Sequence, residues 1–523
     1  MIRPPSESSL TWLSALLVFA ITFVALGIVS SGLGLTWDES TYFGYVEALG
    51  SSLAKGTLLM DIQSDPALSY WINPHPALQK WSTLLFAPPL EPVVGYLLAW
   101  RLPWQGWIAF ELALAFHLIR KQFGWRTSLI FLASLMGMPR FVAYASLGIQ
   151  DGLVALSWLN IALVARSLLG PNRPRAWWLL GALACIAAGA KITGWLALLP
   201  VGILMILHRD WRGAGWVLLI AAGSAVFATA ITPNFWTEEF YRAPLAYVLY
   251  PTLRDQVPIT IYYGGVRYPF DAPWHWGPSI LYATTPPFML LLGSAGLLLA
   301  GFLQRTRWLL PFLILWVFLV VTPSVPRHDD IRQFLPFIPL AILASSLVLD
   351  GLLPKASGAW TTALIAISTI SALQAWFIAS SFPLSYYSPL VGNLEGAEKR
   401  GYDVTLYFES LEPEMLVFIN QNLPQGARIA QLPQWSTNLR LLQRHGLLRE
   451  DIRIMEYTSP TDHDFVLVHR RRAALADHHY FGGRALAEIR FRGVSMLRLI
   501  PLRPQGKGQR EIRHAPSSFS VGQ

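Results

Sequence analysis

The chain has 523 residues, of which 53% are hydrophobic and only 14% are charged, and its formal net charge is +9. Soluble proteins average about 25% charged residues, so the composition excludes an ordinary soluble enzyme and a disordered protein, and the single cysteine excludes a disulfide scaffold. A basic excess is typical either of a nucleic-acid-binding protein or of a membrane protein whose positive charges gather on one side of the bilayer.

Apolar runs that suit a bilayer begin close to the N-terminus. A transmembrane helix needs about 20 mostly apolar residues, and the first run, Leu10–Gly32, is longer than a signal-peptide core and lacks a clear small-residue cleavage site. We therefore predict that it is a retained transmembrane helix. Together with the later runs it predicts eleven spans, a count fixed to within one or two because several runs are short or merged. The later runs are Trp104–Ile119, Thr127–Met138, Gly152–Ala165, Trp177–Ala190, Thr193–Leu207, Gly215–Thr232, Ser279–Leu303, Leu309–Thr322, Phe334–Leu349 and Trp360–Ser380.

The distribution of charge predicts the orientation of these spans. With the N-terminus in the cytoplasm, the inside segments carry 12 basic and 3 acidic residues, a net charge of +9, and the rest of the chain sums to zero. This agrees with the positive-inside rule, so the +9 indicates topology rather than a nucleic-acid partner. An odd number of spans then places the C-terminal segment outside. We expect a multi-pass protein of the plasma (inner) membrane.

Two large loops and a tail are expected on the outer, extracytoplasmic side. The transmembrane domain, residues 1–382, has a first outside loop at 33–100 and a second at 233–278, and the first contains two amphipathic stretches that suit helices at the membrane surface. Residues 383–503 have mixed charge and short apolar runs, which predict a small α/β domain. Residues 504–523 are polar and aperiodic, as expected of a disordered tail. The amphipathic stretches are Thr41–Leu53 and Ala77–Phe86, the predicted strands are Arg428–Leu432, Ile452–Tyr457, Phe465–His469 and Ser495–Ile500, and the predicted helices of the tail are Glu412–Asn422 and Thr437–Arg444.

Two adjacent carboxylates, Asp38 and Glu39, follow the first predicted span within a few residues. Carboxylates so close to the hydrocarbon are costly unless they are paired or used. One interpretation is an acidic first turn that stabilises the positive end of a helix dipole. The other is a general base at the edge of a cavity, positioned by its neighbour. The local sequence leaves both open.

Two further ionisable residues border or interrupt later apolar runs. Asp151 lies between the third and fourth spans, where it is either the N-cap of the following helix or a site residue. Lys191, in the sequence Ala-Lys-Ile-Thr-Gly, breaks an otherwise continuous apolar run. It either extends its ammonium group to the membrane interface or takes part in a site.

Basic residues in the outside loops are candidates for an anion site. His75 and Lys80 lie in the first loop, where prolines at alternate positions fix an extended turn; a solvated His and Lys on a surface helix is the alternative. The stretch 326–336 contains Arg327, Arg332, a histidine and two aspartates. These form either a structural charge network or a phosphate clamp, because guanidinium groups have forked donors. Neither acidic pair has a metal-binding spacing, so no metal site is predicted and a divalent cation stays without specific support.

Taken in order, these motifs resemble the GT-C superfamily of membrane glycosyltransferases, in particular the dolichyl-phosphate-mannose protein mannosyltransferase-like and aminoarabinose transferase-like family. The shared layout is an Asp-Glu pair after the first span, a His/Pro element, an Asp in the next outside loop, a broken apolar run, an Arg/His/Asp loop and an outside tail. In one departure, His75-Pro76 replaces the family's usual Pro-Pro pair. The matched segments, within about residues 1–350, are Trp37–Tyr42, Asn73–Lys80, Gln150–Asp151, Ala190–Gly194 and Arg327–Pro336, and Tyr386–Gly392 is similar to the hinge into the tail.

The resemblance implies an all-α polytopic membrane domain with a small soluble domain, and an inverting transfer of a sugar from a polyprenyl-phosphate donor to an acceptor hydroxyl on the outer face. It implies Asp38 as the catalytic base, Glu39 as the residue that orients it or the acceptor, and Asp151 as a supporting carboxylate. A phosphate leaving group needs cations or dipoles near it, whereas the attacking hydroxyl needs a base. The residues implied for the donor phosphate are Arg332 first, then Arg327, Lys80, Lys191 and His75.

Two other functions are compatible with a polytopic protein. A lipid or solute transporter without catalysis is expected to show repeated halves and broken helices near the midplane, whereas the ionisable residues here gather on one side, with only Glu111 and His117 well inside a span. A tail that binds a partner and uses the spans as an anchor would need far fewer than eleven. The expected partners are a polyprenyl-phosphate sugar and a protein, lipid or glycan acceptor, with no nucleic acid and no certain cofactor.

Overall fold

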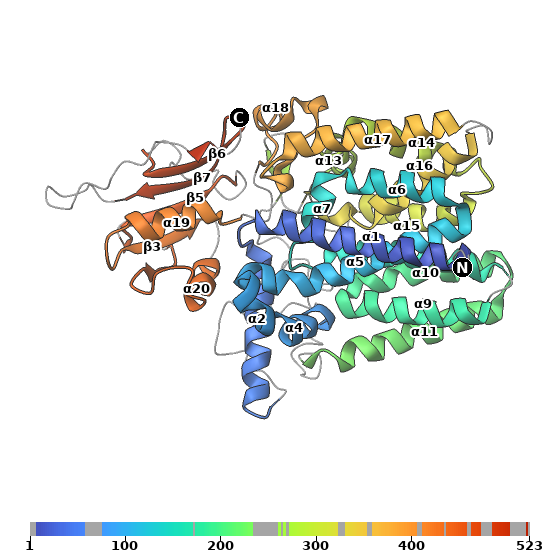
Figure 1. Cartoon of the computed structure of the whole chain (residues 1–523), viewed down its shortest axis with the longest axis horizontal. Coiled ribbons are helices and arrows are strands. Elements are labelled where there is room, and N and C mark those ends of the chain that lie inside the picture. Colours follow the sequence, from blue (N-terminus) through green and yellow to red (C-terminus); the bar gives the residue numbers. More distant parts are fainter. Residues whose placement is uncertain are drawn as a thin grey trace, which may run out of the picture.

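The computed structural model is a long helical bundle with a smaller sheet domain at one end (Figure 1). In this view most helices of the bundle run side by side, and the sheet domain lies at the end opposite the N-terminus. The structure describes residues 7–57, 76–170, 173–233, 260–262, 265–267, 271–322, 330–352, 358–404, 410–432, 436–457, 462–471, 484–502 and 519–520.

The apolar runs of the sequence form the helices of the bundle. Each predicted run coincides with a helix, except that two of the runs contain more than one helical segment. The segments are α1 (Glu7–Ser31), α5 (Tyr96–Phe123), α6 (Trp125–Met136), α7 (Pro139–Ser146), α8 (Asp151–Leu168), α9 (Arg173–Ala190), η1 (Ile192–Ala197), α10 (Leu198–Leu207), α11 (Trp211–Ala230), α13 (Trp276–Thr284), α14 (Pro287–Ala300), η4 (Arg307–Leu309), α15 (Leu310–Val321), η5 (Asp330–Phe334), α16 (Phe337–Leu352) and α17 (Gly358–Ala379).

Proline explains where one predicted span is wrong. The run Ser279–Leu303 was expected to be one helix, but it contains α13 and α14, which are separated at Pro286. Proline lacks a backbone N–H and disfavours helical geometry in the residue before it, so α13 ends at Thr284 and α14 restarts with Pro287 at its first position. The run Thr193–Leu207 is likewise divided into a 3-10 turn, η1, and a short α-helix, α10.

The number of membrane crossings stays a prediction. In the described part of the chain, four helical segments are long and apolar enough to cross a membrane, and α6 with α7, bent by 79°, makes a fifth if the pair is one span. Other helices, including α9, α14 and α16, are apolar but shorter. The four segments are Thr11–Ser31, Asp151–Leu168, Trp211–Ala230 and Thr362–Ala379.

Burial separates the centre of the bundle from its outer surface. In α8, 89% of the apolar window is buried, against 28% in α1 and 22% in α11 and in α17. The side chains that α1 leaves exposed are large and apolar, such as Leu16 and Ile28. Large exposed apolar surfaces mark contact with a membrane or a partner, so α8 is the core helix and α1 has the surface of a lipid-facing helix.

The segment predicted to be the first outside loop contains two helices that lie near the sheet domain. They are α2 (Trp37–Ala54) and α4 (Leu78–Val94), which overlap the two amphipathic stretches of the sequence. In Figure 1, α2 lies across the end of the bundle rather than along it. The start of α4 is fixed to the end of α11, because Trp81 Nε1 donates to the carbonyl of Ile231 at 2.7 Å and the Ala77 amide donates to Thr232 Oγ1 at 3.1 Å.

The C-terminal domain contains a six-stranded mixed sheet of order β4-β3-β5-β7-β6-β8. Strand β3 pairs in parallel with β4 and β5, whereas β7 is antiparallel to both β5 and β6. The strands are β3 (Arg428–Leu432), β4 (Arg453–Ile454), β5 (Phe465–His469), β6 (Ala487–Phe491), β7 (Val494–Pro501) and β8 (Phe519–Ser520), with helices α18 (Asn393–Lys399), α19 (Pro413–Asn422) and α20 (Thr437–Arg444). A separate hairpin, in the segment predicted to be the second outside loop, has β1 (Thr260–Tyr262) and β2 (Gly265–Arg267).

The strand predictions for this domain differ from the structure in three places. The predicted strand Ile452–Tyr457 is only the two-residue β4, and β6 was not predicted. A hairpin joins β6 to β7 through Arg492 and Gly493, both with positive φ, and an Arg-Gly turn is a weak sequence signal. Strand β8 lies in residues 504–523, which were expected to be disordered; it pairs with β6, and local composition does not reveal such a partner.

Arginine contacts, one buried and one exposed, hold the C-terminal domain and its linker to the bundle. Arg140 Nε donates to the carbonyl of Tyr386 at 2.7 Å, and the Arg140 guanidinium lies 4.4 Å from the ring centre of Tyr387. On the sheet side, Arg492 donates to two carbonyl groups at the C-terminal end of α17, each at 2.8 Å. The hinge-like segment Tyr386–Gly392 is therefore held by Arg140, and the sheet domain that follows it is held at α17 by Arg492.

Candidate active site

A chain of ion pairs joins residues that are far apart in the sequence. Arg332 is at its centre: Nη1 lies 2.8 Å from Asp38 Oδ2, and Nε donates to Asp151 Oδ2 at 2.9 Å. Lys191 Nζ donates to the other oxygen of Asp151 at 2.7 Å. Four of the residues predicted for the site are thus in one network.

Each of these four residues stands at a helix end or within a short helical turn. Asp38 is the second residue of α2, Asp151 is the first residue of α8, and Lys191 is extended, with φ −154° and ψ 141°, between α9 and η1. Arg332 lies in the short turn η5. Helix N-termini favour carboxylates because their backbone N–H groups are unpaired and the helix dipole is positive there.

The positions of Asp151 and Lys191 bear on the alternatives that the sequence left open. The N-cap position of α8 is Gln150, with no side-chain capping bond, so Asp151 is not the cap. Its carboxylate instead lies between two cationic groups, and Lys191 turns its ammonium to that carboxylate with only 20% of its side chain exposed. Asp151 therefore lies one residue after the N-cap position, and Lys191 extends to Asp151 rather than to the membrane interface.

The network is largely withdrawn from solvent. The side chains of Asp38, Arg332 and Asp151 are 12%, 9% and 5% exposed. Buried charges are costly unless they are paired, and here two carboxylates face two cationic groups, so the set is formally neutral. An anionic ligand would compete with the carboxylates for the guanidinium and the ammonium.

Glu39 has a different environment from its neighbour Asp38. Its carboxylate is fully buried and accepts two bonds from Arg101, at 2.7 and 2.6 Å, and one from the Gly148 amide at 2.7 Å. It also accepts from the backbone and hydroxyl of Thr36, in a capping box at the start of α2. The helix-cap interpretation of the acidic pair therefore holds for Glu39, and its contacts favour the role of orienting Asp38 over contact with an acceptor.

Arg101 was missed as a site residue. Its guanidinium is fully buried and, besides Glu39, donates to the carbonyls of Ser30, Leu33 and Gly34 at 2.6–2.9 Å. It therefore ties the end of α1 and the start of α2 to α5. The available signal was a single Arg near the outer end of an apolar run, next to Trp100 and Pro103, but such a residue more often extends to the membrane interface.

Tyr42 is a second residue that the sequence did not single out. Its hydroxyl accepts a bond from Gln150 Nε2 at 2.9 Å, which links α2 to the residue before Asp151. Burial, and next the negative charge of Asp38, raise the pKa of Tyr42 far above its ordinary value. The hydroxyl therefore stays protonated beside the two carboxylates at neutral pH.

Lys80 is buried on α4 near this network. Its Nζ lies 4.1 Å from the ring centre of Tyr45 and 5.7 Å from that of Tyr42. Burial lowers the pKa of Lys80 from 10.5 to about 7, because the low-dielectric surroundings disfavour the charged form. The alternative of a solvated surface lysine does not hold, since only 2% of the residue is exposed.

Two predicted residues, His75 and Arg327, lie outside the described residues, so their place relative to the network is not given. The same holds for the side chains of the two aspartates at 329 and 330. Among the residues that the structure does describe, His, Cys, Asp and Glu form no group of three or more that could hold a metal ion.

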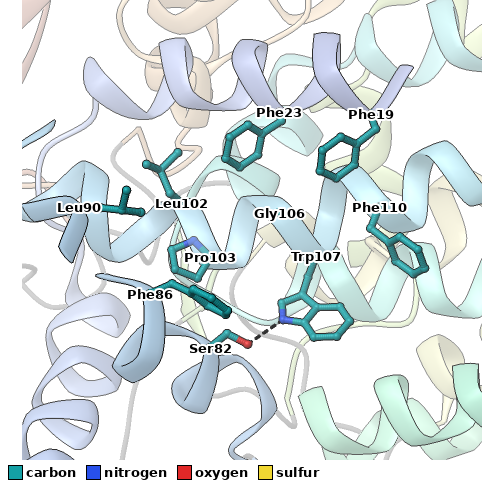
Figure 2. Close-up of a pocket in the computed structure, with 10 residues that line it drawn as sticks. All are labelled: Phe19, Phe23, Ser82, Phe86, Leu90, Leu102, Pro103, Gly106, Trp107 and Phe110. Carbon is teal, nitrogen blue, oxygen red and sulfur yellow. Dashed lines mark hydrogen bonds between the residues drawn. The ribbon is translucent and has the colours of Figure 1, made fainter. Parts of the chain in front are cut away.

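An apolar groove with a volume of about 440 Å³ lies between α1, α4 and α5 (Figure 2). Its polar point is Ser82, whose Oγ accepts a bond from Trp107 Nε1 at 2.8 Å. Ser82 is two residues after Lys80 in α4, so their side chains leave the helix on different sides. The groove lining is Phe19, Phe23, Ser82, Phe86, Leu90, Leu102, Pro103, Gly106, Trp107 and Phe110.

Comparison with known proteins identifies the fold. No family model matches the chain, and no curated protein matches it in sequence. The structure is similar to that of ArnT from Cupriavidus metallidurans in the apo state, with a TM-score of 0.53 and 12% identity over 95% of this chain and 99% of that chain. The same ArnT bound to undecaprenyl phosphate gives a TM-score of 0.52 and 13% identity over 94% and 98%. The chain therefore has the fold of ArnT, which agrees at the level of the fold with the resemblance inferred from the sequence.

Proposed function

We propose that the protein is an integral-membrane inverting glycosyltransferase that moves a sugar from a polyprenyl-phosphate donor to an acceptor hydroxyl on the extracytoplasmic face. The observation that carries this proposal is the network of Asp38, Arg332, Asp151 and Lys191, in which carboxylates and cations meet in a chain with the fold of ArnT. Such a set contains both a base for a hydroxyl and cations for a phosphate.

Asp38 is the proposed general base. Of the three carboxylates in or beside the network, its side chain is the most exposed, at 12%, against 5% for Asp151 and 0% for Glu39. Asp151 lies between two cations and Glu39 is held by Arg101, so both are poor candidates for accepting a proton. Asp151 supports the site by orienting Arg332 and Lys191 from one carboxylate.

Arg332 is the first candidate for the donor phosphate. Its forked guanidinium suits the oxygens of a phosphate, and in this structure the group is shared between two carboxylates. A bound donor phosphate would replace Asp38 as an acceptor of hydrogen bonds from the Arg332 guanidinium. This exchange would free the Asp38 carboxylate to accept the hydroxyl proton. Lys191 and Lys80 are further candidates, and Arg327 and His75 stay in the proposal on the sequence resemblance alone.

An inverting course is proposed because the network offers one available carboxylate. A retaining transfer needs a second residue as a covalent nucleophile, and Asp151, neutralised by two cations, is a weak nucleophile. The proton moves from the acceptor hydroxyl to Asp38, the new bond forms between that oxygen and the sugar, and the bond between the sugar and the phosphate oxygen breaks. The phosphate leaves with the electron pair and needs no general acid, because cations stabilise its charge.

A lipid-linked donor also suits the surroundings of the site. One of the ArnT structures with this fold is bound to undecaprenyl phosphate. The apolar groove between α1, α4 and α5 offers hydrocarbon contacts on the helix that also bears Lys80. A long isoprenoid chain requires such an apolar surface, whereas a water-soluble nucleotide sugar does not.

The test is transfer of a radiolabelled sugar by the purified full chain from a panel of undecaprenyl-phosphate sugars, with the Asp38→Asn variant alongside. Asp38→Asn preserves size but removes the base, so we expect transfer to fall by about 10²–10⁴-fold with unchanged membrane insertion. Asp350→Asn, near the C-terminal end of α16, is the matched control. Turnover by Asp38→Asn at the wild-type rate would exclude this carboxylate as the base, and no transfer from any donor in the panel would favour a non-catalytic transporter.

A further inference from the structure

We propose that the C-terminal domain is a positioning element of the active site, and that its docking holds the segment that bears Asp38. The inference rests on the proposed function, because it assigns a role to Asp38 in catalysis. It starts from a series of contacts that the C-terminal domain makes with residues on both sides of Asp38. An independent binding module would not need to contact this segment.

The first contacts precede Asp38. The Leu411 amide donates to the carbonyl of Leu35 at 3.0 Å, forming an isolated antiparallel bridge, and Asn438 Nδ2 donates to the same carbonyl at 3.5 Å. The approach is so close that a Cβ at Gly34 would lie 2.0 Å from the carbonyl oxygen of Leu411. The Gly34 backbone also bonds to the buried Glu412. Only a glycine at this position lets the two backbones meet.

The next contacts flank Asp38 directly. The guanidinium of Arg471, two residues after β5, lies 6.0 Å from the ring centre of Trp37, which is the residue before Asp38. Two residues after Asp38, Ser40 Oγ lies 3.4 Å from Thr437 Oγ1 at the start of α20. The segment that bears Asp38 therefore contacts the C-terminal domain at positions between residue 34 and residue 40.

A third set of contacts is ionic and lies further along α2. Glu47 accepts bonds from Arg444 at 2.8 Å and from His445 at 2.6 Å, both at the end of α20. The His445 ring also stacks on Tyr96, with 3.6 Å between the ring centres, and its Nδ1 is 3.5 Å from Glu91 of α4. The domain is thus docked on α2, α4 and α5 together, next to the site.

The physical consequence concerns the geometry of Asp38. The bundle anchors the start of α2 through Glu39 and Arg101, but a helix that lies across the end of the bundle can still rotate about such an anchor. The contacts from the C-terminal domain oppose that rotation. A misplacement of about 1 Å can cost about 10²-fold in rate. Loss of docking is therefore expected to lower kcat more than it weakens donor binding.

The first test is Gly34→Ala in the full chain. Gly34 does not have a positive φ, so alanine brings no backbone strain of its own, and its effect comes from the clash with Leu411. The matched control is Gly32→Ala, where the nearest atom to the added Cβ is 3.7 Å away. We expect Gly34→Ala to lower kcat for transfer by about a hundredfold with little change in donor KM, and Gly32→Ala to behave as the wild type.

The second test does not depend on a buried clash. Arg444→Glu brings a carboxylate beside Glu47 and Glu91, and Glu47→Arg in the same chain restores an opposite pair. We expect Arg444→Glu to lower kcat and to speed hydrogen exchange of the backbone amides at 35–42, and the double variant to recover both. A loss of stability that did not come from the contact between residues 444 and 47 would not be rescued by the charge swap.

The two readouts separate this inference from the proposed function. Faster exchange at 35–42 that the double variant reverses, in a chain without transfer activity, would support the docking contacts and reject the glycosyltransferase proposal. Normal exchange and normal kcat in both Gly34→Ala and Arg444→Glu would overturn the positioning role while leaving the proposed function intact. The same result would favour an independent C-terminal module.

Discussion

Removal of the buried charge at Glu39 tests how the site is held. Glu39→Gln keeps the size of the side chain, but whichever way the amide is turned, its NH₂ group faces at least two donors among Arg101, Gly148 and Thr36. The guanidinium of Arg101, with 0% of its side chain exposed, then has no counter-charge in this pair. Breaking a buried ion pair by removing one partner costs about 3–5 kcal/mol, which is a large share of the stability of a typical domain.

The assay combines thermal unfolding in detergent with the kinetics of sugar transfer. At about 1–2 °C per kcal/mol for a domain of this size, the unfolding midpoint of Glu39→Gln should fall by about 5 °C. The kcat of sugar transfer should also fall, because Asp38 lies in the first turn of α2 and moves with it. The control is Asp350→Asn, which breaks a 3.4 Å pair whose arginine side chain is 53% exposed and should cost at most about 1 kcal/mol. A Glu39→Gln protein with an unchanged midpoint and unchanged kcat would refute the structural role of the pair.

Two further predictions concern pH. Burial lowers the pKa of Lys80 to about 7, so its ammonium form is present below pH 7 and lost above it. If Lys80 binds the donor phosphate, kcat/KM for the donor should fall as pH rises through 7, and Lys80→Arg, which stays charged, should remove this decline. An unchanged pH profile in Lys80→Arg would show that Lys80 does not contact the phosphate. Burial raises the pKa of Glu412 from 4.5 to about 7, so the folded state binds this proton more tightly than the unfolded state. Its contribution, about 3 kcal/mol at most, is present below pH 4.5 and lost as pH rises through 7. The unfolding midpoint should therefore decline from pH 5 to pH 8 more steeply in the wild type than in Glu412→Gln, and equal slopes would contradict this assignment.

Hydropathy located the helices because the outer surface and the core of the bundle are both apolar. Runs such as Leu10–Gly32 could be recognised without knowledge of their neighbours, and α1 matches that run closely. The prediction failed where a break depended on local backbone chemistry, as at Pro286, or on pairing between distant segments, as in β6 and β8. Strand pairing is a property of two segments, so the composition of one is insufficient.

The site residues were predictable as residue types but not as a network. Asp38, Asp151, Lys191 and Arg332 stood out because each is a charge beside apolar sequence, yet nothing in their spacing shows that Arg332 joins two carboxylates. Arg101 stood in an equally apolar setting and was missed, because the carboxylate that it neutralises is 62 positions away in the sequence. Side chains that act through such distant partners can be ranked only after the helices have been placed.

The ion-pair network can be completed only late in synthesis of the chain. Asp151 and its partner Arg332 are separated by 181 residues, which a ribosome adds in about 10–40 s. Asp38 and Asp151 have been made when that interval begins, and Lys191 is added 40 residues later, but the arginine that joins the carboxylates comes only at its end. A chain interrupted between α11 and η5 therefore has two carboxylates of the network, Asp38 and Asp151, against one cation, Lys191. The nascent protein is expected to need a temporary cation or an incompletely packed α2 until the later helices enter the membrane.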